Sequence, residues 1–142
     1  HANDLNPIKL KMMVFEEIER IDHQGKKATQ LIKPVNIIPN DTVVYITEYQ
    51  NSGKQKANNV VITNPIPDNL VYIPDSATQN DALVTYSVDN GKKFNVANKL
   101  AVTDQEGKKR PAGPKDYTHV RWVIQSIAAD SKGSVRFSAQ LK

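Results

Sequence analysis

Three histidines, His1, His23 and His119, are the residues with the most specific chemistry in this chain. An N-terminal histidine can hold copper(II) through its α-amino and ring nitrogens, and His23 or His119 would complete a T-shaped site, because nitrogen ligands in a square plane suit that ion. The competing interpretation is that His1 belongs to a leader cleaved after Ala2 or to a tag remnant. His23 then lies in a turn, and His119 is a partly exposed strand residue. Copper binding is therefore kept as an alternative function.

Two pairs of acidic residues are candidates for general acid and base catalysis. Glu16 and Glu17 are adjacent in a segment that alternates like a strand, so their side chains point to opposite faces and cannot act together on one substrate. Asp104 and Glu106 lie in a polar segment with the composition of an exposed loop. Neither pair predicts a catalytic site.

Sequence motifs for other kinds of site were not found. The chain contains no phosphate-binding loop, metalloprotease histidine pair or nucleophile elbow. Asp75, Asp81 and Asp89 would bind calcium if their loops converged, but they lack the spacing of an EF-hand loop. The absence of cysteine excludes disulfides, thiolate chemistry and cysteine-ligated metals. We therefore expect a protein that is not an enzyme and, copper apart, has no cofactor.

The distribution of charge argues against nucleic acid as a partner. The 19 basic and 15 acidic residues give a net charge of +4, and the basic residues form short groups beside glycines, such as Lys26-Lys27 after Gly25. Such positions are typical of exposed turns, whereas nucleic-acid binding favours a dense basic stripe with interleaved aromatic residues. The expected partner is another protein, of unknown identity, and the oligomeric state stays open.

Two features bear on location. No apolar run approaches the roughly 18 residues that are needed to span a bilayer. The first residue is His1 rather than methionine, and our preferred interpretation is that a secretory leader has been removed. We therefore expect an extracytoplasmic protein, periplasmic or at the cell surface, without a membrane span.

Alternation of apolar and polar residues predicts strands along most of the chain. Ile8, Leu10, Met12 and Val14 alternate with polar or bulky neighbours near the N-terminus, and residues 22–25 predict a hairpin turn. Further strands are predicted at 42–50, 57–64, 70–73, 83–96 (a hairpin), 119–127 and 135–141, and a long exposed loop at 103–116. This pattern is typical of a β-sandwich of roughly seven to nine antiparallel strands.

The predicted strand 42–50 is apolar on both faces, with Val44 and Ile46 on one and Val43 and Tyr45 on the other. We expect the N-terminal strand to cover one of these faces. An uncovered face would be an interaction surface, and the edge strands of such sandwiches can accept a strand from a partner. Trp122, on an alternating strand, is predicted to lie in the core between two sheets.

Residues 39–73 resemble the bacterial repeat family catalogued as "domain of unknown function eleven". The matching positions are Asn40-Asp41, Tyr45, Asn51-Ser52-Gly53, Ala57-Asn58-Asn59-Val60, Asn64-Pro65-Ile66-Pro67 and Leu70-Val71-Tyr72. The resemblance extends through Asp89-Asn90-Gly91, residues 119–122 and the closing strand, about three-quarters of the chain. It departs from the family pattern at Asn64, where the family usually has aspartate. The resemblance implies an immunoglobulin-like sandwich of exported or cell-surface bacterial proteins, with no established activity and no catalytic residues.

We therefore expect an all-β, immunoglobulin-like sandwich. Residues 1–142 are expected to form one domain, with an N-terminal strand and hairpin at 1–33 and the family-like core at 34–142. The leading hypothesis is a non-catalytic structural or protein-interaction domain of an exported bacterial protein. The alternatives are a periplasmic copper-binding protein that uses His1 and, more weakly, a carbohydrate-binding module.

Overall fold

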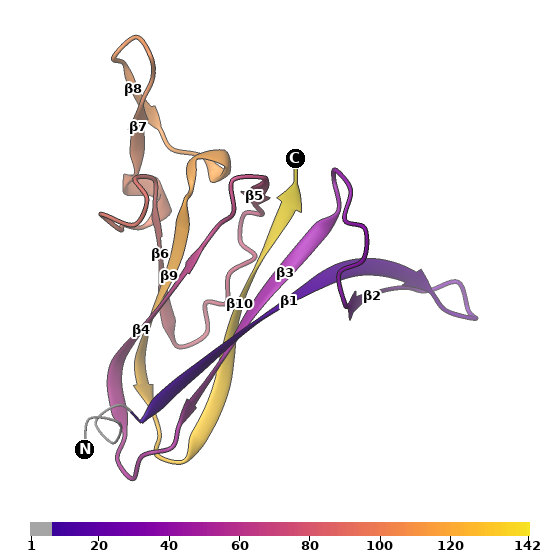
Figure 1. Ribbon diagram of the computed structural model, residues 1–142, viewed down its shortest axis with the longest axis vertical. Coiled ribbons are helices and arrows are strands. Elements are labelled where there is room, and N and C mark those ends of the chain that lie inside the picture. The colour runs from indigo at the N-terminus through magenta and orange to yellow at the C-terminus, as the bar shows by residue number, and fades with distance from the viewer. Residues whose placement is uncertain (1–6) are drawn as a thin grey trace.

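The alternating segments form ten strands in the computed structural model, which describes residues 7–142 (Figure 1). The strands are β1 (Ile8–Ile21), β2 (Lys27–Ile32), β3 (Thr42–Asn51), β4 (Ala57–Pro65), β5 (Leu70–Tyr72), β6 (Ala82–Ser87), β7 (Ala101–Thr103), β8 (Lys109–Pro111), β9 (His119–Ile127) and β10 (Ser131–Leu141). Two short 3-10 turns, η2 (Ala97–Lys99) and η3 (Pro114–Asp116), are the helical elements in this part of the chain. The prediction of an all-β sandwich is confirmed.

Two antiparallel sheets make up the layers of the sandwich. The first has the strand order β2-β1-β3-β10-β5, and the second has the order β4-β9-β6. Strand β3 is the centre of the first sheet, because it pairs with β1 through ten residue pairs and with β10 through another ten. Strand β9 has the same central role in the second sheet, between β4 and β6.

The core fills the space between the two sheets. Trp122 of β9 and Phe137 of β10 are fully buried, and their ring centroids lie 6.2 Å apart, so one large side chain from each sheet meets in the middle. The predicted core position of Trp122 is confirmed. The residues of this core cluster are Val43, Ile62, Ile66, Leu70, Tyr72, Ala77, Tyr86, Tyr117, Val120, Trp122, Ile124, Ile127, Val135, Phe137 and Ala139.

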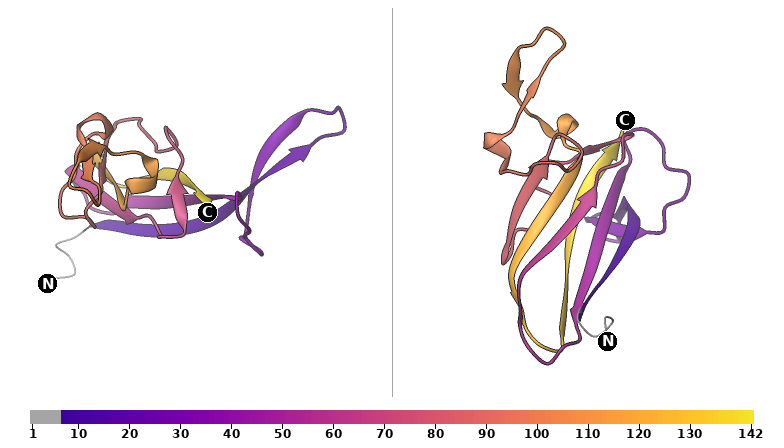
Figure 2. Two further views of the ribbon diagram at one scale, coloured as in Figure 1. Left: turned by 90° about the horizontal axis from the view of Figure 1, so that it is seen from above. Right: turned by 60° about the vertical axis from the view of Figure 1, so that its left-hand side comes forward.

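The expectation that the N-terminal strand covers a face of strand 42–50 was wrong. Strand β1 instead extends the sheet sideways. Residues 8–17 pair edge to edge with β3, and residues 16–21 pair with β2. The half of β1 that pairs with β2 leaves the sandwich and forms a two-stranded arm, which Figure 2 shows projecting away from both layers. The reason is geometric: a strand with free backbone groups beside β3 completes a ladder there, whereas lying across the face would leave those groups unpaired.

The predicted loop at residues 103–116 contains a third, very small sheet. Strands β7 and β8 form a two-stranded ribbon with three residue pairs, closed by a turn at residues 104–108. The Asp104 carboxylate accepts hydrogen bonds from the backbone of Glu106 and Lys108, so it stabilises this turn. The prediction was wrong here, because the glycines and prolines of the segment mark the ends of the ribbon rather than an unpaired loop.

Membrane-spanning helices are absent from the part of the chain that the structure describes: no helix there has the length and apolar character to cross a bilayer.

Candidate interaction surface

The inner side of β1 carries an apolar stripe, formed by Leu10, Met12 and Val14. Each of these residues stands opposite a β3 residue that points into the sandwich, and Cα partners on neighbouring strands share a face. The stripe is therefore on the core side of the sheet. Its residues are nevertheless 51%, 50% and 38% exposed, respectively, so the core does not cover them.

The stripe is open because the second sheet is narrower than the first. The Asn64 side chain of β4 donates a 2.8 Å hydrogen bond to the Thr47 hydroxyl of β3, so β4 lies across from β3. Strand β4 is the edge of its sheet, and β1 lies one strand beyond β3. No strand among residues 7–142 therefore faces the stripe. We call this uncovered region, between β1 and the free edge of β4, the open side.

Two tyrosines of β3 line the inner end of the open side. The Tyr45 ring stacks on Phe137 with centroids 5.1 Å apart, and burial raises the pKa of its hydroxyl. The Tyr49 ring lies over Gly133 of β10, in the space that a β-carbon there would occupy. The glycine thus allows a large aromatic side chain to lie flat against the sheet. Both tyrosines are half-buried and join the stripe to the core.

One end of the open side is fixed by the turn between β3 and β4. Gly53 lies against the ring of Pro7, and the backbone N–H of Ser52 donates to the carbonyl of Pro7. Below them, the fully buried Asn51 donates to the carbonyls of Gln55 and Ile127 and accepts from Gly53. These bonds tie β1, the turn and the end of β9 together, so Asn51 links the two sheets.

Lysines surround the same end of the sandwich. Lys9 and Lys11 flank Leu10 on β1, and Lys54 and Lys56 lie in or beside the β3–β4 turn. Lys132 of β10 borders, with Lys9, Lys11, Glu48, Gln50 and Ser134, a shallow hollow of about 430 Å³ on the outer face of the first sheet. Positive charge therefore exceeds negative charge around this end, where the acidic residues among residues 7–142 are Glu48 and Asp130.

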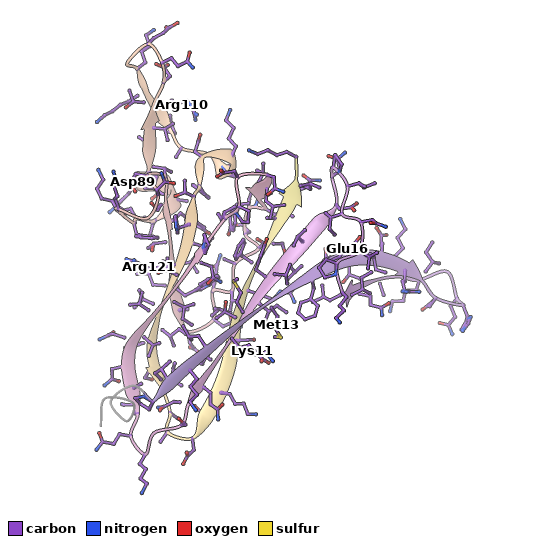
Figure 3. The ribbon with its side chains drawn as sticks, viewed as in Figure 1. Lys11, Met13, Glu16, Asp89, Arg110 and Arg121 are labelled. Atoms are coloured by element: carbon purple, nitrogen blue, oxygen red, sulfur yellow. The ribbon has the colours of Figure 1, made fainter. Side chains whose placement is uncertain are left out.

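A second exposed apolar row lies on the outer face of the second sheet. Val61, Val123 and Leu83 are Cα partners across β4, β9 and β6, and the two flanking residues, Val61 and Leu83, are exposed. Next along β9, the Arg121 guanidinium lies 3.6 Å from the ring centroid of Phe94. Figure 3 shows Arg121 on this side of the molecule, away from Lys11 and Met13 of β1.

The structure does not bring the described histidines together. His23 lies in the turn at the tip of the arm, whereas His119 begins β9 in the second sheet, and these elements are at opposite sides of the molecule (Figure 1). His119 contacts the Thr118 hydroxyl at 3.0 Å and the edge of Phe94. His1 lies outside the described residues. A copper site would therefore combine His1 with one of these histidines, not with both.

The acidic residues singled out from the sequence act mainly within turns. Asp89 accepts hydrogen bonds from the backbone N–H groups of Lys92 and Lys93 and from the Ser87 hydroxyl, and these bonds lower its pKa. Asp75 and Asp81 have the left-handed backbone of turn residues. Among residues 7–142, no three His, Asp or Glu side chains are grouped closely enough to hold a metal ion. The loops that carry Asp75, Asp81 and Asp89 therefore do not converge into a calcium site within residues 7–142.

Glu16 and Glu17 take opposite faces of β1, as their adjacent positions predict. Glu16 shares the face of its partner Val43, which is in the core, whereas Glu17 is opposite Thr42 on the other face. One Glu16 oxygen is 3.4 Å from the backbone nitrogen of Val35. The Glu16 carboxylate therefore contacts the chain at the base of the arm, and the two carboxylates do not form an acid–base pair.

Comparisons with known proteins identify no relative: no family model, curated protein or solved structure matches this chain. The resemblance of residues 39–73 to the repeat family accordingly stays a prediction.

The sequence signalled the stripe but not its exposure. Alternation placed Leu10, Met12 and Val14 on one face of a strand, which is equally the pattern of a covered strand. The available hint was the pair Lys9 and Lys11, because lysines on a strand commonly protect an exposed edge. The width of the second sheet, which decides the exposure, depends on long-range pairing.

Proposed function

We propose that this chain is a non-catalytic protein-interaction domain of an exported bacterial protein and that it binds its partner at the open side. The observation that carries the proposal is the exposure of Leu10, Met12 and Val14 on a face that otherwise points into the core. Contiguous apolar surface of this kind is typical of protein-binding sites, because covering it removes apolar area from water.

The packing of the aromatic residues favours a protein over a glycan as the ligand. Carbohydrate-binding modules use exposed planar aromatic rings. Here Tyr45 is stacked on Phe137, and the Arg121 guanidinium lies over the ring of Phe94. Tyr72, Tyr86 and Tyr117 pack against one another inside the sandwich. These rings support the structure, so the interaction hypothesis uses the available surface better.

A photo-crosslinking amino acid at position 12 tests the proposal in the cells that produce the protein. We expect one discrete crosslinked product, which disappears when Leu10→Lys and Val14→Lys are added. The matched control is Leu83→Lys, which charges an equally exposed apolar residue on the outer face of the second sheet and should leave the product unchanged. No product, or a product lost equally with Leu83→Lys, contradicts an interaction at the open side.

The extracytoplasmic location is part of the proposal, and the resemblance of residues 39–73 supports it. Protease added to intact cells, before and after the outer membrane or wall is opened, tests it. Digestion without lysis of the cytoplasmic membrane is expected, with a cytoplasmic protein as the protected control. Protection equal to that of the control would place the protein inside the cell.

A further inference from the structure

We propose that the partner contributes an extended strand that pairs with the free edge of β4 and lays alternate apolar side chains over Leu10, Met12 and Val14. This inference rests on the proposed interaction function and specifies the chemistry of the ligand. An extended peptide can satisfy both features of the open side at once. Its backbone fills the unpaired edge, and its side chains, which alternate with a period of two, cover the apolar stripe.

The position of β4 fits this role. Strand β4 has β9 on one side, and among residues 7–142 no strand is hydrogen-bonded to its other side. Asn64 of β4 contacts Thr47, which is the Cα partner of Met12, so the free edge passes alongside the stripe. A strand added to a sheet lies about 4.8 Å from its neighbour. The added strand would therefore lie over β1, in the layer that the second sheet lacks.

Two strand edges border the open side, those of β1 and β4, and their sequences indicate which one can accept a partner strand. Strand β1 pairs with β3 on one side, and its pairing with β2 on the other begins only at Glu16. Its Lys9 and Lys11 are typical of edges protected against strand addition. Strand β4, with the sequence ANNVVITNP, contains no charged residue. After Asn59, whose φ is +52°, it offers the regular stretch 60–64 before Pro65. The unprotected edge is thus β4.

The charge at the rim specifies the partner further. Lys54 and Lys56 lie just before β4, at the end of the sandwich where the stripe begins. An extended segment entering at this end passes these lysines, so acidic residues beside its apolar positions would gain favourable Coulomb energy and faster association. We assign the ligand as an extended segment of another protein with alternating apolar residues, about five residues of pairing strand, and acidic residues on at least one flank.

Phage-displayed random dodecapeptides, selected on the immobilised protein, test this assignment. We expect enrichment of peptides with alternating apolar residues and an acidic flank. Selection on the Met12→Lys variant should lose them, and selection on Leu83→Lys should retain them. Enrichment of sequences without alternation, of basic peptides, or of none at all would overturn the proposed ligand.

Hydrogen exchange locates a synthetic copy of the most enriched peptide. Protection of amides within residues 60–64 supports strand addition to β4, and protection confined to residues 9–15 contradicts it. Methylating alternate backbone nitrogens of the peptide removes its ladder donors and should weaken binding at least about tenfold, which corresponds to a loss of roughly 1.4 kcal/mol or more. Equal binding of the methylated peptide overturns backbone pairing.

The two proposals fail in different ways. A crosslink at position 12 in cells, together with no β4 protection by any selected peptide, leaves an interaction domain whose partner is not a strand. Loss of the crosslink removes the interaction at the open side altogether. Analytical sedimentation of the free protein tests whether a second copy of the chain binds the stripe instead. Self-association that Met12→Lys abolishes would show that a second copy, rather than another protein, covers the stripe.

Discussion

The ring of Tyr49 occupies the space beside Gly133 where a β-carbon would otherwise point, and the two residues are Cα partners on β3 and β10. A β-carbon built on Gly133 would lie 2.6 Å from Cζ and 3.0 Å from Cε1 of that ring. The tyrosine therefore packs where it does only because its partner is glycine, an arrangement that also protects the glycine backbone from water.

Gly133→Ala is expected to push the Tyr49 ring into the open side and to lower the free energy of unfolding by about 1 kcal/mol, at the low end for overpacking because the ring can swing. Urea denaturation measures this change. In a Tyr49→Ala background the same substitution should cost almost nothing, since the colliding ring is gone. An equal cost in both backgrounds would show that the strain lies in the backbone of β10.

Charging the stripe is expected to leave stability nearly unchanged. Met12→Lys places a long amphipathic side chain at a half-exposed position, so the free energy of unfolding should change by no more than about 0.5 kcal/mol. Val135→Lys, on the same side of the first sheet but buried, should prevent folding or cost several kcal/mol. Circular dichroism with urea measures both, and a large loss with Met12→Lys would mean that the open side is covered.

Asn51→Ala is expected to lower the free energy of unfolding by about 2–4 kcal/mol. The buried side chain makes three hydrogen bonds, and its removal leaves their partners unpaired. Asn51→Asp should cost more at neutral pH, because a carboxylate would face the carbonyls of Gln55 and Ile127. Acidification should recover part of that extra loss by protonating the carboxylate. Urea titrations of the three proteins across pH provide the measurement, and an Asp variant as stable as wild type would contradict the hydrogen-bond assignment.

Stability is expected to fall under alkaline conditions through the buried tyrosines. Desolvation, followed by the 2.7 Å hydrogen bond to the Tyr72 hydroxyl, raises the pKa of Tyr86, and burial also raises the pKa of Tyr45 and Tyr117. A raised folded-state pKa favours the neutral form, so this contribution is complete below the unfolded value of about 10 and is lost progressively above it. Tyr86→Phe should flatten the decline between pH 9 and about 11 in urea titrations; an unchanged slope would exclude Tyr86 as its source.

Prediction from sequence succeeded where a property is local. The alternation around Trp122 fixed which residues of β9 enter the core, and Asp22 to Gly25 marked the hairpin at the arm's tip. It failed where a property depends on which distant segments pair. The position of β1 beside β3, rather than across its face, follows from pairing between residues 25 to 43 positions apart, as Met12 with Thr47. The exposure of the stripe is a consequence of that choice, so local alternation could not reveal it.

The layout of the first sheet also determines how the molecule would bear tension. Ile8 at the start of β1 and Ser131 at the start of β10 are both level with Asn51, so β1 and β10 run in the same direction on either side of β3. A pull between Ile8 and Leu141 therefore acts along the strands. The ladder bonds, which are perpendicular to the strands, would be loaded in shear and many at once, instead of opening one after another. We therefore expect the sandwich to resist tension that is applied along its strands.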